Sequence, residues 1–233
     1  MLLPLRYVGR RTHRSDGEAR RVAILEATLR LIVKEGIRGV RHRAVALEAN
    51  VPLASTTYYF KDIKDLISDA LTYFAEKTLW MNNTLEQKSF QLLQTLKQAG
   101  DQVSRKALAD NLSLFICEHI KEQVSHRDDR ILEVAFHEEA LRNPQLASAI
   151  QSLDNALLNT IEQFFVQLGS SQAMAEAHQV LGLIRWVEYQ TVVSGKLDEA
   201  QLNEIITVCI NNIFTSPIES PISDSTNRAL TSS

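Results

Sequence analysis

Apolar residues recur at helical spacing through most of this chain. Between residues 18 and 214 they follow one another at intervals of three or four positions, as Leu66, Ala70 and Phe74 do. No convincing run of the alternating pattern of a half-buried strand interrupts this spacing. The pattern therefore predicts an all-α protein.

Helix-breaking residues divide the pattern into about ten helices. Gly36, Asn50 and Gly195 are typical of helix ends, and Asp62 and Asp198 are suited to cap the helices that follow them. The expected helices span 18–35, 42–49, 53–59, 62–86, 88–99, 103–125, 129–141, 144–168, 172–194 and 198–214. Two very short helices thus precede several long ones, which predicts a three-helix head followed by a larger helical bundle.

The sequence HRAVALEANVPLASTTYY, at residues 42–59, has the features of a helix-turn-helix. Ala46 allows close helix packing, Asn50 tolerates the positive φ of a tight turn, and apolar Val51 follows it. Pro52 suits the first turn of the second helix, where its missing N–H costs no hydrogen bond. The head is therefore expected to hold a helix that can enter the major groove of DNA.

The second short helix carries groups that DNA recognition uses. Short hydroxyls reach base edges or phosphates, a methyl group packs on thymine, and phenolic hydroxyls reach phosphate oxygens. The expected DNA contacts are Ala54, Ser55, Thr56, Thr57, Tyr58 and Tyr59. Phe60 is expected to turn inward and pack against Ile24, Val45 and Leu66.

About 45 contiguous residues of this region resemble the TetR family of transcriptional regulators. The resemblance implies a DNA-binding domain over 18–66 and a ligand-binding and dimerisation domain over 67–214. Two departures are Arg41, where the family often has a capping Thr, and Thr57, where it has an aromatic residue. The matching segments are ILEATLRLIVKEG (24–36), VRHRAVALEANV (40–51), PLASTTYYF (52–60) and KDIKDL (61–66).

The resemblance also implies DNA contacts from basic residues. Arg43 aligns with a basic position that reaches a base edge, commonly guanine, in the family. Arg41 and His42 stand at the start of the same helix, where backbone N–H groups also receive a phosphate. Lys64 lies one residue after the position of the family's lysine. The alternative is that Arg41 and Arg43 are solvated charges on a helix surface.

The charge distribution supports a head that binds a polyanion. Residues 1–66 carry 13 Lys and Arg against 7 Asp and Glu, whereas residues 67–233 carry 12 against 21. The segment RYVGRRTHR (6–14) is strongly basic, and residues 1–17 are expected to form a flexible arm. This arm either contacts DNA or only adds solubility. Residues 215–233 are rich in Ser and Thr and are expected to be a disordered tail.

The last two helices predict a homodimer. The apolar face of 172–194 is too broad for a helix with one wet side, and 198–214 lies beside it in sequence. A two-fold four-helix interface would cover both helices. The alternative is an ordinary core helix within a monomer. The expected interface residues are Val180, Ile184, Val187, Leu202, Ile206 and Ile213.

The body is also expected to bind a small molecule. Several of its helices combine aromatic and apolar side chains with a few polar ones, a mixture suited to a mostly apolar effector. The same residues also fit positions in an ordinary core. The candidates are Phe115, Cys117, His119, Phe136, His137, Leu141, Trp186 and Tyr189.

No motif favours catalysis, a cofactor or a bound metal. HEEAL (137–141) lacks the second histidine of HExxH, and Cys117 and Cys209 stand far apart. No apolar run approaches the roughly 18 residues of a membrane span. We therefore expect a cytoplasmic, non-enzymatic protein whose partners are double-stranded operator DNA, a second copy of itself and an unidentified small molecule.

These patterns together predict a sequence-specific transcriptional regulator. The expected form is a homodimeric repressor that binds a palindromic operator and is released by a small, mostly apolar effector. The alternative is a helical ligand-binding or protein-interaction module without DNA-binding activity.

Overall fold

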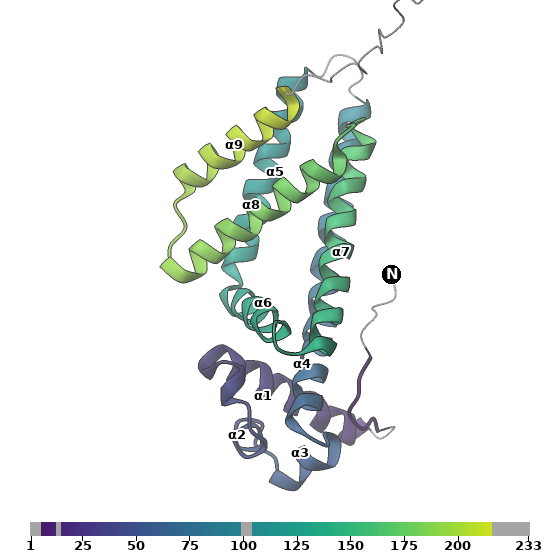
Figure 1. Ribbon diagram of the computed structural model, residues 1–233, viewed down its shortest axis with the longest axis vertical. Coiled ribbons are helices and arrows are strands. Elements are labelled where there is room, and N and C mark those ends of the chain that lie inside the picture. The colour runs from purple at the N-terminus through teal and green to yellow at the C-terminus, as the bar shows by residue number, and fades with distance from the viewer. Residues whose placement is uncertain (1–5, 13–14, 99–103, 216–233) are drawn as a thin grey trace, which may run out of the picture.

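The computed structural model describes residues 6–12, 15–98 and 104–215. Within these residues every regular element is helical, so the all-α prediction is confirmed. The elements are α1 (Ser15–Glu35), the 3-10 helix η1 (Ile37–Gly39), α2 (His42–Glu48), α3 (Leu53–Tyr59), α4 (Ile63–Gln98), α5 (Arg105–Ser125), α6 (Arg127–Ala140), α7 (Pro144–Gln167), α8 (Ala173–Ser194) and α9 (Glu199–Thr215). Helices α1 to α3 form a small head at one end of the molecule, and α4 runs from that head into the larger bundle (Figure 1).

Helix α4 differs from its prediction. It is one continuous helix of 36 residues, where the sequence was expected to give two helices separated at residue 87. The stretch TLEQKS, at 84–89, contains neither glycine nor proline, so no residue there ends a helix. A single rigid element thus joins the head to the far end of the bundle.

The expected helix ends are confirmed at several positions. Asn50 adopts φ 52° in the turn between α2 and α3, and Gly195 adopts φ 69° after α8. Asp62 accepts a hydrogen bond from the N–H of Asp65 at 2.9 Å, which caps the first turn of α4. Asp198 caps α9 by accepting from two backbone N–H groups.

The core of the head continues into the bundle. Phe60 is fully buried in one apolar cluster with Ile24, Val45 and Leu66, as predicted. The same cluster includes Phe74 of α4 and Phe136 of α6, whose rings stack with centroids 5.9 Å apart. A movement of α4 or α6 therefore acts directly on the packing of the head.

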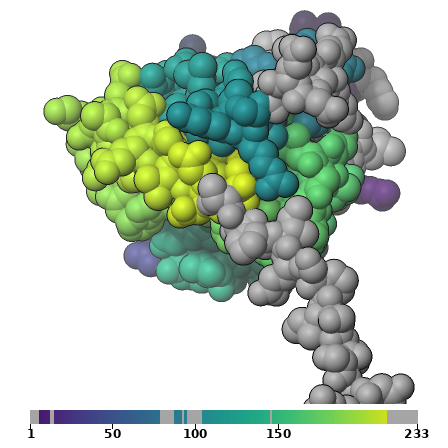
Figure 2. All heavy atoms as spheres, turned by 90° about the horizontal axis from the view of Figure 1, so that it is seen from above, coloured from purple at the N-terminus to yellow at the C-terminus, as the bar shows by residue number. Residues whose placement is uncertain are grey.

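A second core lies further from the head. It joins α5, α8 and α9 with the end of α7, around buried Ile120, Phe165 and Ile206. Seen from above, α9 lies across α5 (Figure 2). None of the helices in the described part of the chain has the length and apolar character needed to cross a membrane. The expected disordered tail, apart from Thr215, lies outside the described residues.

Candidate DNA-binding surface and effector cavity

Helix α3 presents an outer face to solvent. Pro52 immediately precedes the helix with φ −58°, as expected of a residue that starts it. Ala54, Thr57 and Tyr58 are exposed, and Ser55 is partly exposed. Since 51% of Tyr58 is accessible, its hydroxyl is available to a partner outside the chain.

Thr56 and Tyr59 lie on the opposite, buried face of α3, so their expected contact with DNA is corrected. The Thr56 hydroxyl donates to the carbonyl of Leu53 at 2.8 Å and lies 3.2 Å from the Nδ1 of His42. The Tyr59 hydroxyl donates to the carbonyl of Gly17 at 3.0 Å. The 3.6-residue period of the helix places these two positions against the head while their neighbours face outward. Both residues orient α3 from within.

The basic candidates of the head are accessible. Arg41, Arg43 and Lys64 are exposed, and none of their side chains has a hydrogen bond or ion pair to another described residue. His42 is partly buried, with its ring turned toward Thr56. Three positive charges thus remain free around the helix-turn-helix, whereas His42 helps to join α2 to α3.

Residues 6–12 are docked on the head, so the flexible arm expected there is corrected. The N–H groups of Val8 and Gly9 donate to the two oxygens of Asp69, at 2.6 and 3.1 Å. The N–H of Arg10 donates to the carbonyl of Tyr59, at 2.7 Å. These bonds fasten the segment to both α4 and the end of α3.

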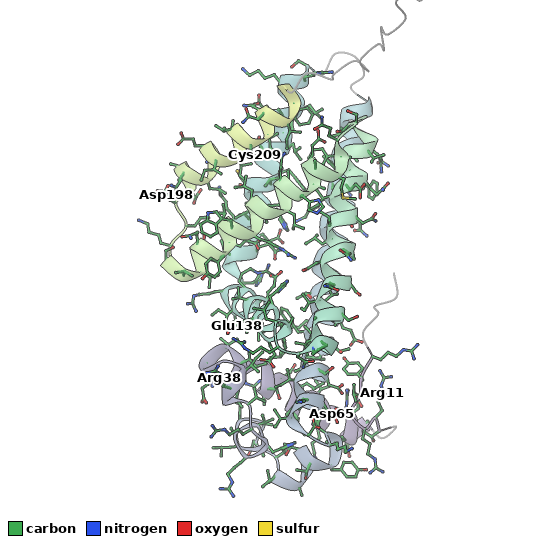
Figure 3. The ribbon with its side chains drawn as sticks, in the orientation of Figure 1. Arg11, Arg38, Asp65, Glu138, Asp198 and Cys209 are labelled. Atoms are coloured by element: carbon green, nitrogen blue, oxygen red, sulfur yellow. The ribbon has the colours of Figure 1, made fainter. Side chains whose placement is uncertain are left out.

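A buried ion pair and a glycine make this docking possible. Asp69 is fully buried and accepts a hydrogen bond from Arg21 at 2.8 Å. A Cβ on Gly9 would lie 2.8 Å from both Asp69 and Phe60, so the approach requires glycine. The guanidinium of Arg10 then lies 4.3 Å from the centroid of the Tyr58 ring. Arg11 marks this edge of the head in Figure 3, and Arg38 lies at the opposite edge.

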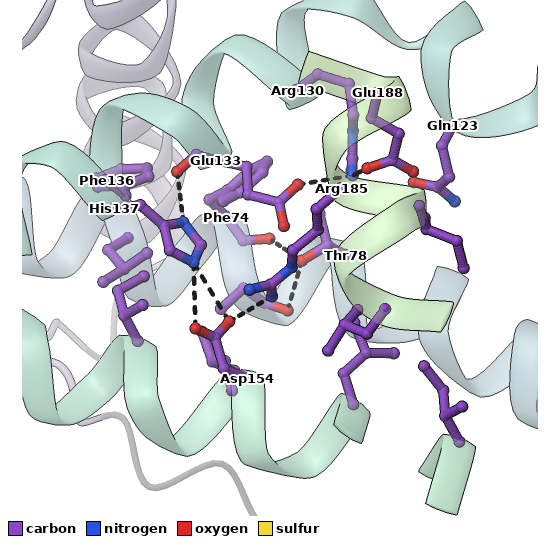
Figure 4. A pocket seen from close by; sticks show the side chains of 18 of the residues that line it. Phe74, Thr78, Gln123, Arg130, Glu133, Phe136, His137, Asp154, Arg185 and Glu188 are labelled. Atoms are coloured by element: carbon purple, nitrogen blue, oxygen red, sulfur yellow. Dashed lines mark hydrogen bonds and ion pairs between the residues drawn. The ribbon is translucent and has the colours of Figure 1, made fainter. Parts of the chain in front are cut away.

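A cavity of about 120 Å³ lies among α4, α5, α6, α7 and α8. Phe74 and Phe136, which belong to the core of the head, form part of its wall. Ionisable side chains converge on the rest of the wall (Figure 4). They are Arg130, Glu133, His137, Asp154, Arg185 and Glu188, together with His119. The cavity therefore combines an aromatic side with a charged one.

The charges in the cavity are arranged in two groups. Asp154 pairs with Arg185 at 2.6 Å and with the Nε2 of His137 at 3.3 Å. Arg130 pairs with Glu133 at 2.6 Å and with Glu188 at 3.4 Å, in both cases through Nη1. Arg130 Nε is buried without a hydrogen-bond partner.

Burial and pairing shift the pKa values of these groups in different directions. Burial raises the pKa of Glu188 to about 7, although Arg130 partly opposes the shift. Burial also acts to raise the pKa of Asp154, but hydrogen bonds from His137 and Arg185 outweigh it and lower this pKa to about 2. Burial lowers the pKa of His119 to about 4, so its imidazole is neutral at pH 7.

A second cavity of about 60 Å³ adjoins the first. His119, Ile161 and Ile184 line both, so they form a shared wall. Apart from His119 and two hydroxyl residues, the smaller cavity is lined only by apolar side chains, among them Phe115, Phe164 and Val180. Polar and apolar spaces thus lie next to each other inside the bundle.

Half of the predicted effector residues line these cavities. Phe115, His119, Phe136 and His137 do so. Cys117 is buried but lines neither cavity, and Leu141, Trp186 and Tyr189 are exposed, so these four are corrected. The sequence analysis missed Arg130, Asp154, Arg185 and Glu188. The presence of Arg185 and Glu188 within the broad apolar run of α8 could have indicated that these charged side chains are buried.

The predicted interface residues are also corrected. Five of the six are buried within the single chain and the sixth, Ile213, is partly buried. They are Val180, Ile184, Val187, Leu202, Ile206 and Ile213. A different face of α8 is exposed and consists of Met174, His178, Gly182, Trp186, Tyr189 and Val193, which we call the α8 stripe. The rings of Trp186 and Tyr189 stack on it, with centroids 6.2 Å apart.

Comparison with known proteins identifies the body and the fold. Residues 103–212 match the model of the tetracyclin repressor-like C-terminal domain. No curated protein matches the chain. A solved structure of a TetR-family regulator from Mesorhizobium loti is similar with a TM-score of 0.64 and 14% identity, over 86% of this chain and 97% of that one.

Two further solved structures are similar. A TetR-family member from Streptomyces coelicolor gives a TM-score of 0.52 and 24% identity, over 82% of this chain and 97% of that one. The regulator FadR from Bacillus subtilis, solved with stearoyl-CoA, gives a TM-score of 0.52 and 15% identity, over 83% and 97%. At these identities the structures show a shared fold.

The helix-turn-helix head and the helical body with its cavities together form the fold seen in solved TetR-family transcriptional regulators. Residues 103–212 are similar to the tetracyclin repressor-like C-terminal domain, and the described residues share the fold of solved TetR-family structures.

Proposed function

We propose that this protein is a repressor that binds a palindromic operator as a homodimer and leaves it when a small molecule occupies the larger cavity. One observation carries the proposal. Phe74 and Phe136 line that cavity and also belong to the core of the head. A ligand that displaces either ring changes how α4 and α6 pack against α1, and so changes the position of the head.

The proposed DNA surface combines α3 with the start of α2 and the docked segment 6–12. Arg43 contacts a base edge, and Ala54, Ser55 and Thr57 face the groove. Tyr58 contacts phosphate, with Arg10 stacked on its ring. Arg41 and Lys64 supply further phosphate contacts from the exposed surface of the head.

Dimerisation is proposed to use the α8 stripe. Its apolar members are exposed on one side of α8, and Gly182 in its middle has open space around it, so a second helix can approach closely. A two-fold axis through this face would give a homodimer with two copies of α3. Recognition helices about 34–36 Å apart read successive major grooves on one face of DNA. A ligand-driven change in that separation lowers operator affinity.

A mobility-shift titration with the DNA flanking the protein's own gene tests the proposal. We expect a sequence-selective shift at low salt, with one dimer bound to a palindromic site. The absence of a selective shift would leave the alternative of a ligand-binding module without DNA-binding activity. If ligand occupancy did not alter the shift, the release step would be wrong although the DNA-binding function stood.

A further inference from the structure

The lining of the larger cavity contains three carboxylates, Glu133, Asp154 and Glu188, and two guanidiniums, Arg130 and Arg185. Glu133 and Glu188 face one guanidinium there, that of Arg130. The second guanidinium, Arg185, is bound to Asp154 at 2.6 Å and is shared with no other carboxylate. Among the described residues, Glu133 and Glu188 therefore share Arg130 as their ion-pair partner.

Glu188 is the less well paired of these two carboxylates. Its distance to Arg130 Nη1 is 3.4 Å, against 2.6 Å for Glu133. Both acids use the same nitrogen, so neither forms the two-bond fork that makes arginine pairs strong. Its raised pKa reflects the same shortage of positive charge after burial. His119, which also lines the cavity, is neutral at pH 7 and adds no compensating charge.

The smaller cavity supplies an apolar space next to this charge. It shares a wall of His119, Ile161 and Ile184 with the larger cavity, and its remaining lining includes three phenylalanines, Phe115, Phe164 and Phe165. A ligand that spans both spaces must be polar at one end and apolar at the other. With volumes of about 120 and 60 Å³, the cavities suit a small body.

We infer that the effector site takes a small organic monocation, a protonated amine whose ammonium group lies beside Glu188 and Glu133 and whose alkyl or aryl body enters the apolar cavity. This inference rests on the proposed role of the cavity as the effector site. An ammonium group supplies the missing positive charge and donates hydrogen bonds to carboxylates. A ligand carboxylate, in contrast, would add a fourth negative charge to a wall that already carries Glu133, Asp154 and Glu188.

Isothermal titration of the full chain with three probes of equal length tests the charge. The probes are hexylamine, hexan-1-ol and hexanoate, at pH 8, where both the amine and Glu188 are charged. Hexylamine is expected to bind about tenfold tighter than hexan-1-ol, because the alcohol offers only a neutral hydrogen bond. Hexanoate is expected to bind most weakly. Affinity in the series from propylamine to hexylamine should rise about three- to fourfold per methylene.

The variant Glu188→Gln keeps the shape of the side chain and removes its charge. It should lose the preference for hexylamine over hexan-1-ol and retain its affinity for the alcohol. Glu204→Gln, at an exposed position of α9, is the matched control and should keep the preference. Thermal melting of each variant establishes that it is folded.

Several results would overturn the inference: equal binding of the amine and the alcohol, tightest binding of hexanoate, no binding of any probe, or an unchanged preference in Glu188→Gln. The mobility shift is measured separately on the ligand-free protein. Selective DNA binding without amine binding would contradict the inferred amine effector and would still support the proposed repressor function. Amine binding without selective DNA binding would contradict the proposed repressor function and would still support the amine site in the cavity.

Discussion

Arg21 donates to Asp69 across 2.8 Å, and both side chains are almost completely buried between α1 and α4. The same carboxylate receives the N–H groups of Val8 and Gly9, so one buried acid joins the N-terminal segment, the first helix and the long helix. We expect Asp69→Ala to lower the free energy of unfolding by about 3 kcal/mol, because it leaves the buried Arg21 charge with only the partly exposed Glu18 as its partner. Urea unfolding measures this loss.

The double variant Arg21→Met with Asp69→Ala should recover part of the loss, since it removes the buried charge and leaves only the partly exposed Glu18 without its partner. Asp110→Ala, at an exposed position of α5, is the control and should change stability by less than about 0.5 kcal/mol. A loss as small in Asp69→Ala as in the control would show that this ion pair does not hold the head together.

The docked segment leads to a prediction about DNA affinity. If Arg10 reaches a phosphate from its place on Tyr58, Arg10→Gln should reduce the slope of log affinity against log salt by about 0.9. Gly9→Ala should have a similar effect, because the added Cβ cannot fit beside Asp69. Arg38→Gln removes an exposed charge at the opposite edge of the head and serves as the control (Figure 3). A slope that stays at its original value in Arg10→Gln would exclude the segment from the DNA contact.

Two residues of the head should differ in what they contribute to DNA binding. Arg43→Ala should relax preference at one base pair of each half-site, with a loss of about 1–3 kcal/mol for the preferred base. Tyr58→Phe should weaken binding to all sequences about equally, since a phosphate contact carries no base information. Binding to a library of operator variants measures both effects. An unchanged base preference in Arg43→Ala would contradict its assignment to a base edge.

The sequence predicted most helices because their ends are determined locally. Asn50 with its positive φ, Gly195 after α8 and the cap at Asp62 are short-range features, and the structure confirms each. The break expected at residue 87 was wrong because no residue there disfavours a helix. Helix position could therefore be predicted wherever the chain carried an explicit stop.

Which face of a helix is covered could not be predicted in the same way. Helix α8 is apolar around most of its circumference, so periodicity alone did not show which side packs on its own chain. Val187 faces the core, whereas Trp186 next to it is 58% exposed. The same limit applies to Thr56 and Tyr59, whose side chains resemble those of their exposed neighbours. The cavity charges were missed because they come from three helices that only the fold brings together.

The α8 stripe gives a prediction about assembly. Trp186→Glu should weaken the dimer by at least about tenfold, because it places a charge at the centre of an apolar face. The helix itself should remain folded, since the side chain is largely outside the core. Sedimentation velocity across a concentration series measures the change. Leu141→Glu, at a residue that is 82% exposed on the turn after α6, is the control and should leave the dimer intact. If both variants sediment as the original protein does, the stripe is not the interface.

The raised pKa of Glu188 predicts how stability depends on pH. The folded protein keeps the Glu188 proton up to about pH 7, whereas an unfolded chain releases it near the ordinary glutamate pKa of 4.5. Between these values the unfolded state binds fewer protons, so Glu188 makes the protein less stable as pH rises. Glu188→Gln removes this dependence. Relative to the original protein, the variant should gain up to about 3 kcal/mol between pH 4.5 and 7 and nothing more above pH 7.

Urea unfolding of both proteins at pH 5, 6, 7 and 8 measures the difference. His119, whose pKa is lowered from 6.5 to about 4, makes both proteins more stable as pH rises from 5 to about 6.5, so its contribution cancels when the two are subtracted. Glu204→Gln again serves as the control, because its side chain is exposed. A difference between Glu188→Gln and the original protein that stays constant from pH 5 to 8 would mean that Glu188 titrates normally. The shortage of positive charge inferred for the cavity would then be absent.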